Sequence, residues 1–218
     1  MTTSCRLEIK VKNNLFSYIV LLLFLLEGCT QTPESAKEKW LNGIPCTPPC
    51  WENITPGSTT FEQSIELLEN NTDVDNVEIS EYLSMFGDPV QDVTWEITNT
   101  DPLWTGRIIY VNVPNYTETI PALILYTPDI CLKEIVNRYG EPDYIALDNY
   151  RYLNTADLIW SNKNFAFSSE LGDDKVISKN TCGGFIVHYD SEFPYNEVPV
   201  ITVEPDTEVV PWEGYGTY

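Results

Sequence analysis

The most reactive side chains in this chain are six cysteines and one histidine. Many hydrolytic enzymes pair a histidine base with a nucleophile. His188 instead lies in a run at 185–189 that is typical of a β-strand, and we expect its ring to face solvent. No Gly-x-Ser-x-Gly elbow, Ser-x-x-Lys pair or phosphate-binding glycine loop occurs in the sequence. The residues therefore identify no catalytic group and favour a non-enzymatic protein, with the enzyme question left open.

Carboxylates are the commonest charged groups, with 33 acidic against 12 basic side chains and a net charge of −21. This balance excludes a nucleic-acid partner, because binding to phosphates depends on Lys and Arg. It leaves room for a basic protein partner or for weak cation binding. The acidic segment 73–78 lacks the glycine and the ligand order of an EF-hand loop. We predict no metal site and no cofactor, and a two-carboxylate glycosidase pair could be located only in the fold.

The N-terminus has the pattern of an export signal. Basic residues precede an apolar run at 15–26, which is too short to cross a bilayer core of ~30 Å. The run ends in Leu26-Glu27-Gly28-Cys29, which resembles the bacterial lipobox, although Glu27 departs from the usual small residue. We therefore predict a lipoprotein signal peptide at 1–28 and lipidation of Cys29, whose two acyl chains would anchor the protein in the cell membrane or outer membrane, facing outside the cytoplasm. A conventional cleaved signal and an uncleaved anchor are the alternatives.

The cysteines outside this N-terminal segment are even in number: Cys46, Cys50, Cys131 and Cys182. Outside the cytoplasm they favour two disulfides, for which three pairings exist. We predict Cys46–Cys50 as a local link and Cys131–Cys182 as a long-range one. Zinc is the alternative, but the Cys46-x-x-x-Cys50 spacing is loose and no second close pair follows.

The pattern along the chain predicts an α+β fold, with helices on one face of an antiparallel sheet. Helices are expected at 59–69, with Thr59 and Glu62 spaced as a capping box, and at 130–139, which ends at Gly140. Segment 75–86 fits a helix or a strand. Strands are expected at 93–97, 107–113, 122–126, 144–147, 157–161, 165–168 and 185–189.

These elements suggest the organisation of the chain. A polar tether at 29–39 leads into an α+β domain at 40–193, followed by a proline-rich acidic extended tail at 194–218. The two helix patterns align at an offset of 71 positions, Phe61 with Leu132 and Ser64 with Ile135. Two repeated helix-then-sheet units, 54–125 and 126–193, are therefore one interpretation.

Tryptophans are the remaining candidates for ligand contact. Trp95 and Trp160 fall in expected strands and are assigned to the core. Trp51, Trp104 and Trp212 fall in loop or tail contexts, so we predict them at the surface, where their rings could bind a ligand.

Two short stretches carry a resemblance, residues 45–60 (PCTPPCWENITPGSTT) and 139–144 (YGEPDY). They resemble a group of uncharacterised bacterial lipoproteins. The Pro-Gly-x-Thr entry to a helix and the Gly-x-Pro exit from one are similar to small outer-membrane-assembly lipoproteins and β-lactamase-inhibitor-like domains. That resemblance implies helices on one face of an antiparallel sheet and binding to other proteins. Together with the lipobox it predicts a lipid-anchored binding or adaptor module for an envelope protein; the alternative is binding or hydrolysis of cell-surface carbohydrate.

Overall fold

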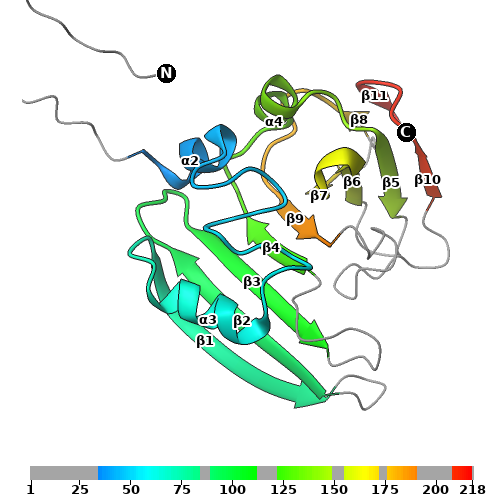
Figure 1. Ribbon diagram of the computed structural model, residues 1–218. Coiled ribbons are helices and arrows are strands. Elements are labelled where there is room, and N and C mark those ends of the chain that lie inside the picture. The colour runs from blue at the N-terminus through cyan, green and yellow to red at the C-terminus, as the bar shows by residue number, and fades with distance from the viewer. Residues whose placement is uncertain are drawn as a thin grey trace, which may run out of the picture. The chain divides into compact units, whose positions relative to one another are not determined.

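An antiparallel sheet of nine strands dominates the structure, which is a computed structural model (Figure 1). The structure describes residues 34–83, 89–111, 122–148, 155–171, 176–190 and 208–217. The chain divides into two units, 1–34 and 35–218, and the elements below belong to the second. Three α-helices accompany the sheet in the described residues, which confirms the predicted α+β class.

The first half of the sheet follows α3 (Phe61–Glu69) and consists of four consecutive strands, β1 (Val74–Leu83), β2 (Pro89–Ile97), β3 (Trp104–Val111) and β4 (Ala122–Tyr126). The second half follows α4 (Leu132–Tyr139) and consists of β5 (Tyr144–Asp148), β6 (Thr155–Trp160), β7 (Phe165–Glu170) and β9 (Phe185–Tyr189). A 3-10 turn, η1 (Ser161–Lys163), with Asn164 in the left-handed region, joins β6 to β7, where the sequence predicts a hairpin turn.

The two halves meet in the middle of the sheet. The strand order is β1-β2-β3-β4-β9-β7-β6-β5-β10, where β10 is Glu208–Pro211. The main-sheet strands of each half thus lie side by side in chain order, and the last strands of the two halves, β4 and β9, pair antiparallel. The helices also match, because the aligned positions Phe61 and Leu132, and Ser64 and Ile135, are all buried. Each half therefore contains a helix followed by four strands of the main sheet, and the second half also contains the short strand β8 (Val176–Ile177) between β7 and β9.

An additional helix, α2 (Ala36–Asn42), precedes both halves, so the expected tether at 29–39 is wrong from Ala36 onward. Residues 36–39 are good helix formers, and Ser35 and Glu38 form a capping box at the start. Trp40 is buried, and Lys39 forms an ion pair with Asp73. The folded domain thus begins closer to Cys29 than the polar composition indicates.

The structure corrects the predicted first residues of two helices and decides the secondary structure of the ambiguous segment. Thr60, not Thr59, caps α3 and forms the capping box with Gln63, while the Thr59 hydroxyl accepts from the Thr55 N–H at 2.9 Å. The second helix begins at Leu132, two residues later than expected. Residues 75–83 of the ambiguous segment belong to the long strand β1, and residues 84–86 lie outside the described residues.

Part of the expected tail joins the sheets. β10 (Glu208–Pro211) pairs antiparallel with β5 at the sheet edge, which is the position where proline is tolerated. β11 (Gly216–Thr217) pairs with β8 (Val176–Ile177) in a separate two-stranded sheet.

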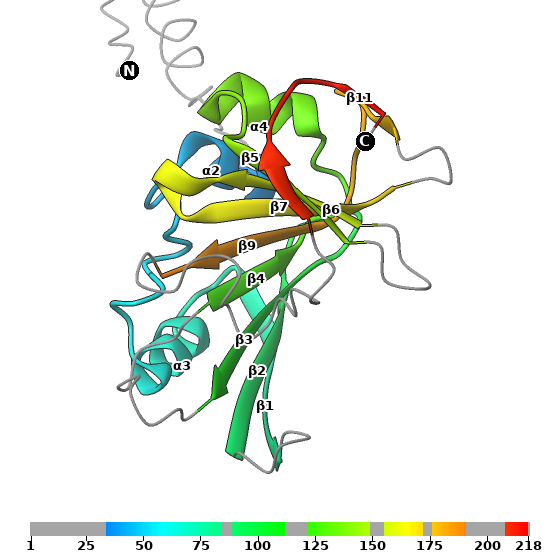
Figure 2. The ribbon, with the colours of Figure 1, turned by 90° about the vertical axis from the view of Figure 1, so that its right-hand side faces the viewer.

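The helices cover one face of the main sheet (Figure 2). Trp40 of α2, Leu68 of α3 and Ile135 of α4 share one core with the inward side chains of the strands. Trp95 and Trp160 lie in this core at 2% and 1% exposure, as predicted. Within the core, Gly106 leaves room for the Trp95 ring: a Cβ atom there would lie 1.9 Å from an indole carbon.

Candidate functional site

The predicted surface positions of Trp51 and Trp104 are wrong. Trp51 is 6% exposed and stacks on Trp95, with ring centroids 5.4 Å apart. Trp104 is 1% exposed, and its Nε1 donates to Asp129 Oδ1 at 2.6 Å. Trp104 is the first residue of β3 and points to the same face as Ile108, so strand alternation takes it into the core. Neither ring can bind a ligand at the surface.

Trp212, the third candidate, is partly exposed and packs against the main core after β10. Its ring meets that of Tyr215 edge to face, with centroids 5.6 Å apart. The three tryptophans come from three separate elements: the loop before α3, strand β3 and the end of the chain. They form no common aromatic platform.

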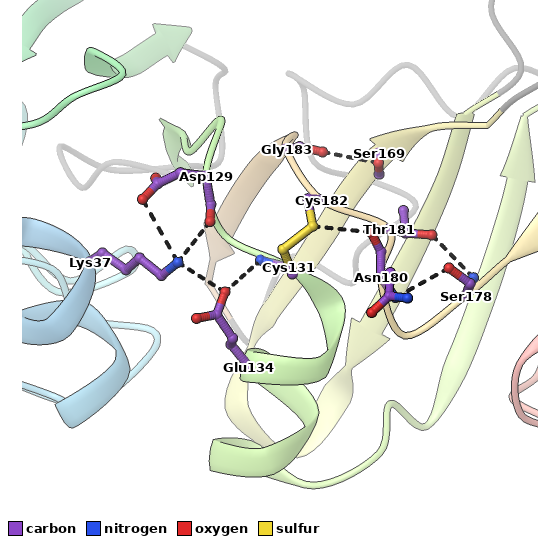
Figure 3. Close-up of a disulfide and its surroundings, with 10 residues drawn as sticks. All are labelled: Lys37, Asp129, Cys131, Glu134, Ser169, Ser178, Asn180, Thr181, Cys182 and Gly183. Atoms are coloured by element: carbon purple, nitrogen blue, oxygen red, sulfur yellow. Dashed lines mark hydrogen bonds and ion pairs between the residues drawn. A yellow bond between two sulfur atoms is a disulfide. The ribbon is translucent and has the colours of Figure 1, made fainter.

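The four domain cysteines form the two predicted disulfides, Cys46–Cys50 and Cys131–Cys182. The first closes the proline-rich loop before α3, and the second joins the N-cap of α4 to the segment that leads into β9 (Figure 3). Both disulfides are structural, because each one holds two parts of the folded domain together. Cys29, the predicted lipidation site, lies outside the described residues.

The long-range disulfide also lies where α2 is attached. Glu134 accepts from the Cys131 N–H at 3.0 Å and forms an ion pair with Lys37 of α2, also at 3.0 Å (Figure 3). Lys37 further donates to the backbone oxygen of Asp129 at 2.8 Å. Helix α2, at the start of the domain, is therefore fastened to the disulfide-bonded end of α4.

The expected solvent-facing position of His188 is wrong, because its ring is fully buried. Trp40 Nε1 donates to His188 Nε2 at 3.2 Å, and this burial lowers the pKa of His188 from 6.5 to about 3. The ring is thus a neutral acceptor that links β9 to α2. It faces no nucleophile and belongs to the core.

The face of the sheet opposite the helices carries the most exposed aromatic pair of the central strands. Tyr126 of β4 and Phe185 of β9 are direct cross-strand partners, 40% and 47% exposed, with ring centroids 5.3 Å apart. Alternation explains their position, since Leu125 and Ile186, the next residues toward each strand's interior, both enter the main core. The two rings are tilted by 47° and form no flat platform.

The strand register extends this pair into a row across six strands. We call it the central row: Glu96, Thr105, Tyr126, Phe185, Ser168 and Asp157. Two aromatic rings occupy its middle, a hydroxyl side chain stands on each side, and a carboxylate lies at each end. The same face continues beside β4 and β9 into a small closed cluster: Ala122, Ala146, Ile159, Ala166, Val187 and Tyr189.

One cation stands beside the central row in the described part of this face. Arg107 is bound to Asp92 through three hydrogen bonds of 2.7–3.1 Å, and the bond to Asp92 raises the pKa of Arg107. At the ends of the row, Glu96 accepts a hydrogen bond from Asn76 Nδ2 at 2.7 Å, and Asp157 is 8% exposed. The exposed middle of the row is apolar and lies within an acidic surface, so it can bind a partner that combines apolar and basic groups.

The sequence contained one signal for this surface that the analysis of single residues missed. Tyr126 is the last residue of β4, and Phe185 is the first residue of β9. Each lies next to a buried residue, Leu125 or Ile186, and therefore points to the opposite face of the sheet. Their pairing depends on the contact between β4 and β9, which are about sixty residues apart, and no local pattern specifies it.

The described residues contain no group of three His, Cys, Asp or Glu side chains placed to hold a metal ion. They also contain no helix of the length and apolar character needed to cross a membrane. Comparisons of the chain with protein-family models, with curated proteins and with solved structures find no significant match.

Proposed function

We propose that this protein is a lipid-anchored, non-enzymatic binding protein of the bacterial envelope, and that its central row binds another envelope protein. The observation that carries the proposal is the exposed Tyr126–Phe185 pair between carboxylates. Aromatic residues are enriched in the cores of protein interfaces, and polar residues at their rims. The middle of the central row follows this arrangement, because the exposed rings are flanked by the hydroxyl side chains of Thr105 and Ser168.

The chemistry of the row indicates the kind of partner. Because the net charge of the chain is −21, electrostatic complementarity favours a partner whose contact surface combines Arg or Lys with apolar side chains. A sugar ligand fits less well, because Trp51 and Trp104 are buried and the exposed rings are tilted rather than coplanar. The protein partner is therefore favoured over carbohydrate.

The attachment of α2 supports the anchoring part of the proposal. Cys29 and the first residue of α2, Ala36, are seven positions apart. A chain of that length reaches at most about 25 Å when fully extended. A lipid on Cys29 would thus keep the domain near the bilayer surface, with α2 held by the Lys37 and Lys39 ion pairs. A binding face held near the membrane suits an adaptor.

Site-specific photo-crosslinking in the native envelope tests the binding face. Benzoylphenylalanine is placed at Tyr126 or Phe185 and, as a matched control, at Tyr215, which is 45% exposed on another part of the domain. We expect the same polypeptide to be linked from Tyr126 and from Phe185 but not from Tyr215. Equal labelling from all three positions, or none from the central row, would contradict the proposal.

The mass of the protein in the membrane fraction tests the anchor. We expect an N-terminus at Cys29 that carries acyl chains, and a Cys29→Ser variant that is neither processed at this site nor retained by the membrane. An intact Met1, or membrane retention of the variant, would refute the lipid anchor and leave the binding face untouched.

A further inference from the structure

A second surface lies at the edge of the sheet, on β1. This ten-residue strand pairs only with β2 among the described strands, so its other side is an open edge (Figure 2). Eight of its ten residues are exposed. An open edge presents unpaired backbone N–H and C=O groups, which can form hydrogen bonds with another extended chain.

Apolar side chains gather at the far end of this edge. Ile79, Tyr82 and Leu83 are 50%, 45% and 68% exposed, which is unusual for three large apolar residues so close together. Tyr82 and Leu83 line a hollow of about 400 Å³ between the ends of the first three strands, together with Glu81, Pro89, Val90, Gln91 and Tyr110. A side chain from an added strand could enter this hollow.

The charge of β1 indicates what kind of strand could bind at this edge. Glu78 and Glu81 are exposed, and neither forms an ion pair with any cation of the described residues. Gln91 donates to Glu81 Oε1 at 2.7 Å and holds this carboxylate at the hollow. Pairing of β1 with a second copy of itself would bring these carboxylates together, and like charges across two strands are destabilising. A basic strand would meet the opposite charge.

We propose that the edge of β1 binds an extended peptide segment of a partner protein by strand addition. Two basic side chains of that segment, three positions apart, pair with Glu78 and Glu81, and an apolar side chain enters the hollow beside Leu83. The site goes beyond the function proposed above and uses a different surface, so either can fail while the other holds.

The probe is a capped octapeptide, Val-Lys-Val-Thr-Lys-Val-Thr-Val, added to the isotope-labelled full chain at low ionic strength. Its counterpart carries Glu in place of Lys. We expect the lysine peptide to shift the backbone amide resonances of β1 more than those of β4 or β9, and the glutamate peptide to leave them unchanged. No binding of the lysine peptide, or shifts centred on the central row, would overturn the proposal.

Charge reversal supplies the matched variants. In Glu78→Lys/Glu81→Lys we expect the lysine peptide to bind about tenfold more weakly and the glutamate peptide to bind. The control Glu66→Lys/Glu69→Lys makes the same change in net charge on exposed positions of α3 and should bind the lysine peptide as before. Leu83→Ala should weaken binding of the lysine peptide, because it removes an apolar contact at the hollow. Equal loss in both double variants would show non-specific attraction and refute the site.

Discussion

Tyr126 and Phe185 pair across β4 and β9, the strands that join the two halves of the sheet. Their rings lie 5.3 Å apart on the face that the helices leave uncovered. The pair therefore stands where the two helix-then-sheet halves meet, and its geometry depends on both. A substitution that shifts the register between β4 and β9 should therefore also displace this ring pair.

Removal of the long-range disulfide should lower stability strongly. Cys131 and Cys182 are 51 positions apart, and closing a loop of that size contributes about 4 kcal/mol in the chain-entropy treatment. Cys46 and Cys50 are four positions apart, for which the same treatment gives about 2 kcal/mol. Urea unfolding followed by tryptophan fluorescence should rank Cys131→Ala/Cys182→Ala well below Cys46→Ala/Cys50→Ala, and the reverse order would contradict the structural role assigned to each.

Substitution of Gly106 by alanine should disrupt the core. A Cβ atom at Gly106 would overlap the Trp95 ring at 1.9 Å, so the ring or the strand must move. We expect a loss of about 2–3 kcal/mol in the free energy of unfolding and an altered near-UV circular dichroism spectrum. Gly216→Ala is the control, because nothing lies within 4 Å of its Cβ position. Equal stability of the two variants would exclude the described packing of Trp95.

His188 should make the protein less stable as the pH falls. Its pKa is about 3 when folded and near 6.5 when unfolded, so below pH 6.5 the unfolded chain binds a proton that the folded protein does not. This difference should cost about 2 kcal/mol between pH 8 and pH 5. His188→Gln keeps an acceptor for Trp40 without titrating. The free energy of unfolding of the variant should therefore fall less over this range, whereas identical pH slopes would show that His188 is not buried as a neutral ring.

Loss of Arg107 should destabilise the open face. The Asp92 side chain is 10% exposed and is bound by the guanidinium at 2.7–3.1 Å. Arg107→Ala leaves this carboxylate nearly buried without its partner, which should cost about 2 kcal/mol in urea unfolding. Arg107→Lys keeps the charge but not the paired hydrogen-bond geometry, so its free energy of unfolding should lie between those of the unchanged protein and Arg107→Ala. A lysine variant as unstable as the alanine variant would contradict a role for the charge.

The sequence allowed most elements to be predicted, because periodicity and caps are local. The strand at 122–126 and the end of α4 at Gly140 follow from the strand pattern and from glycine chemistry. The even count of cysteines predicts two disulfides but allows three pairings, of which the predicted one, with Cys131–Cys182, is the one that forms. Trp104 and His188 were misplaced because their burial depends on which sheet face α2 and the other helices cover. The central row could not be predicted, since it requires the register of six strands.

The affinity of the crosslinked partner for variants of the central row tests the central claim most directly. Titration calorimetry compares the unchanged protein with Tyr126→Ala/Phe185→Ala and with the control Tyr215→Ala. Loss of two aromatic contacts at the centre of an interface should weaken binding about a hundredfold, and the control should bind like the unchanged protein. Unchanged affinity of the double variant, with its fold intact by circular dichroism, would contradict the account.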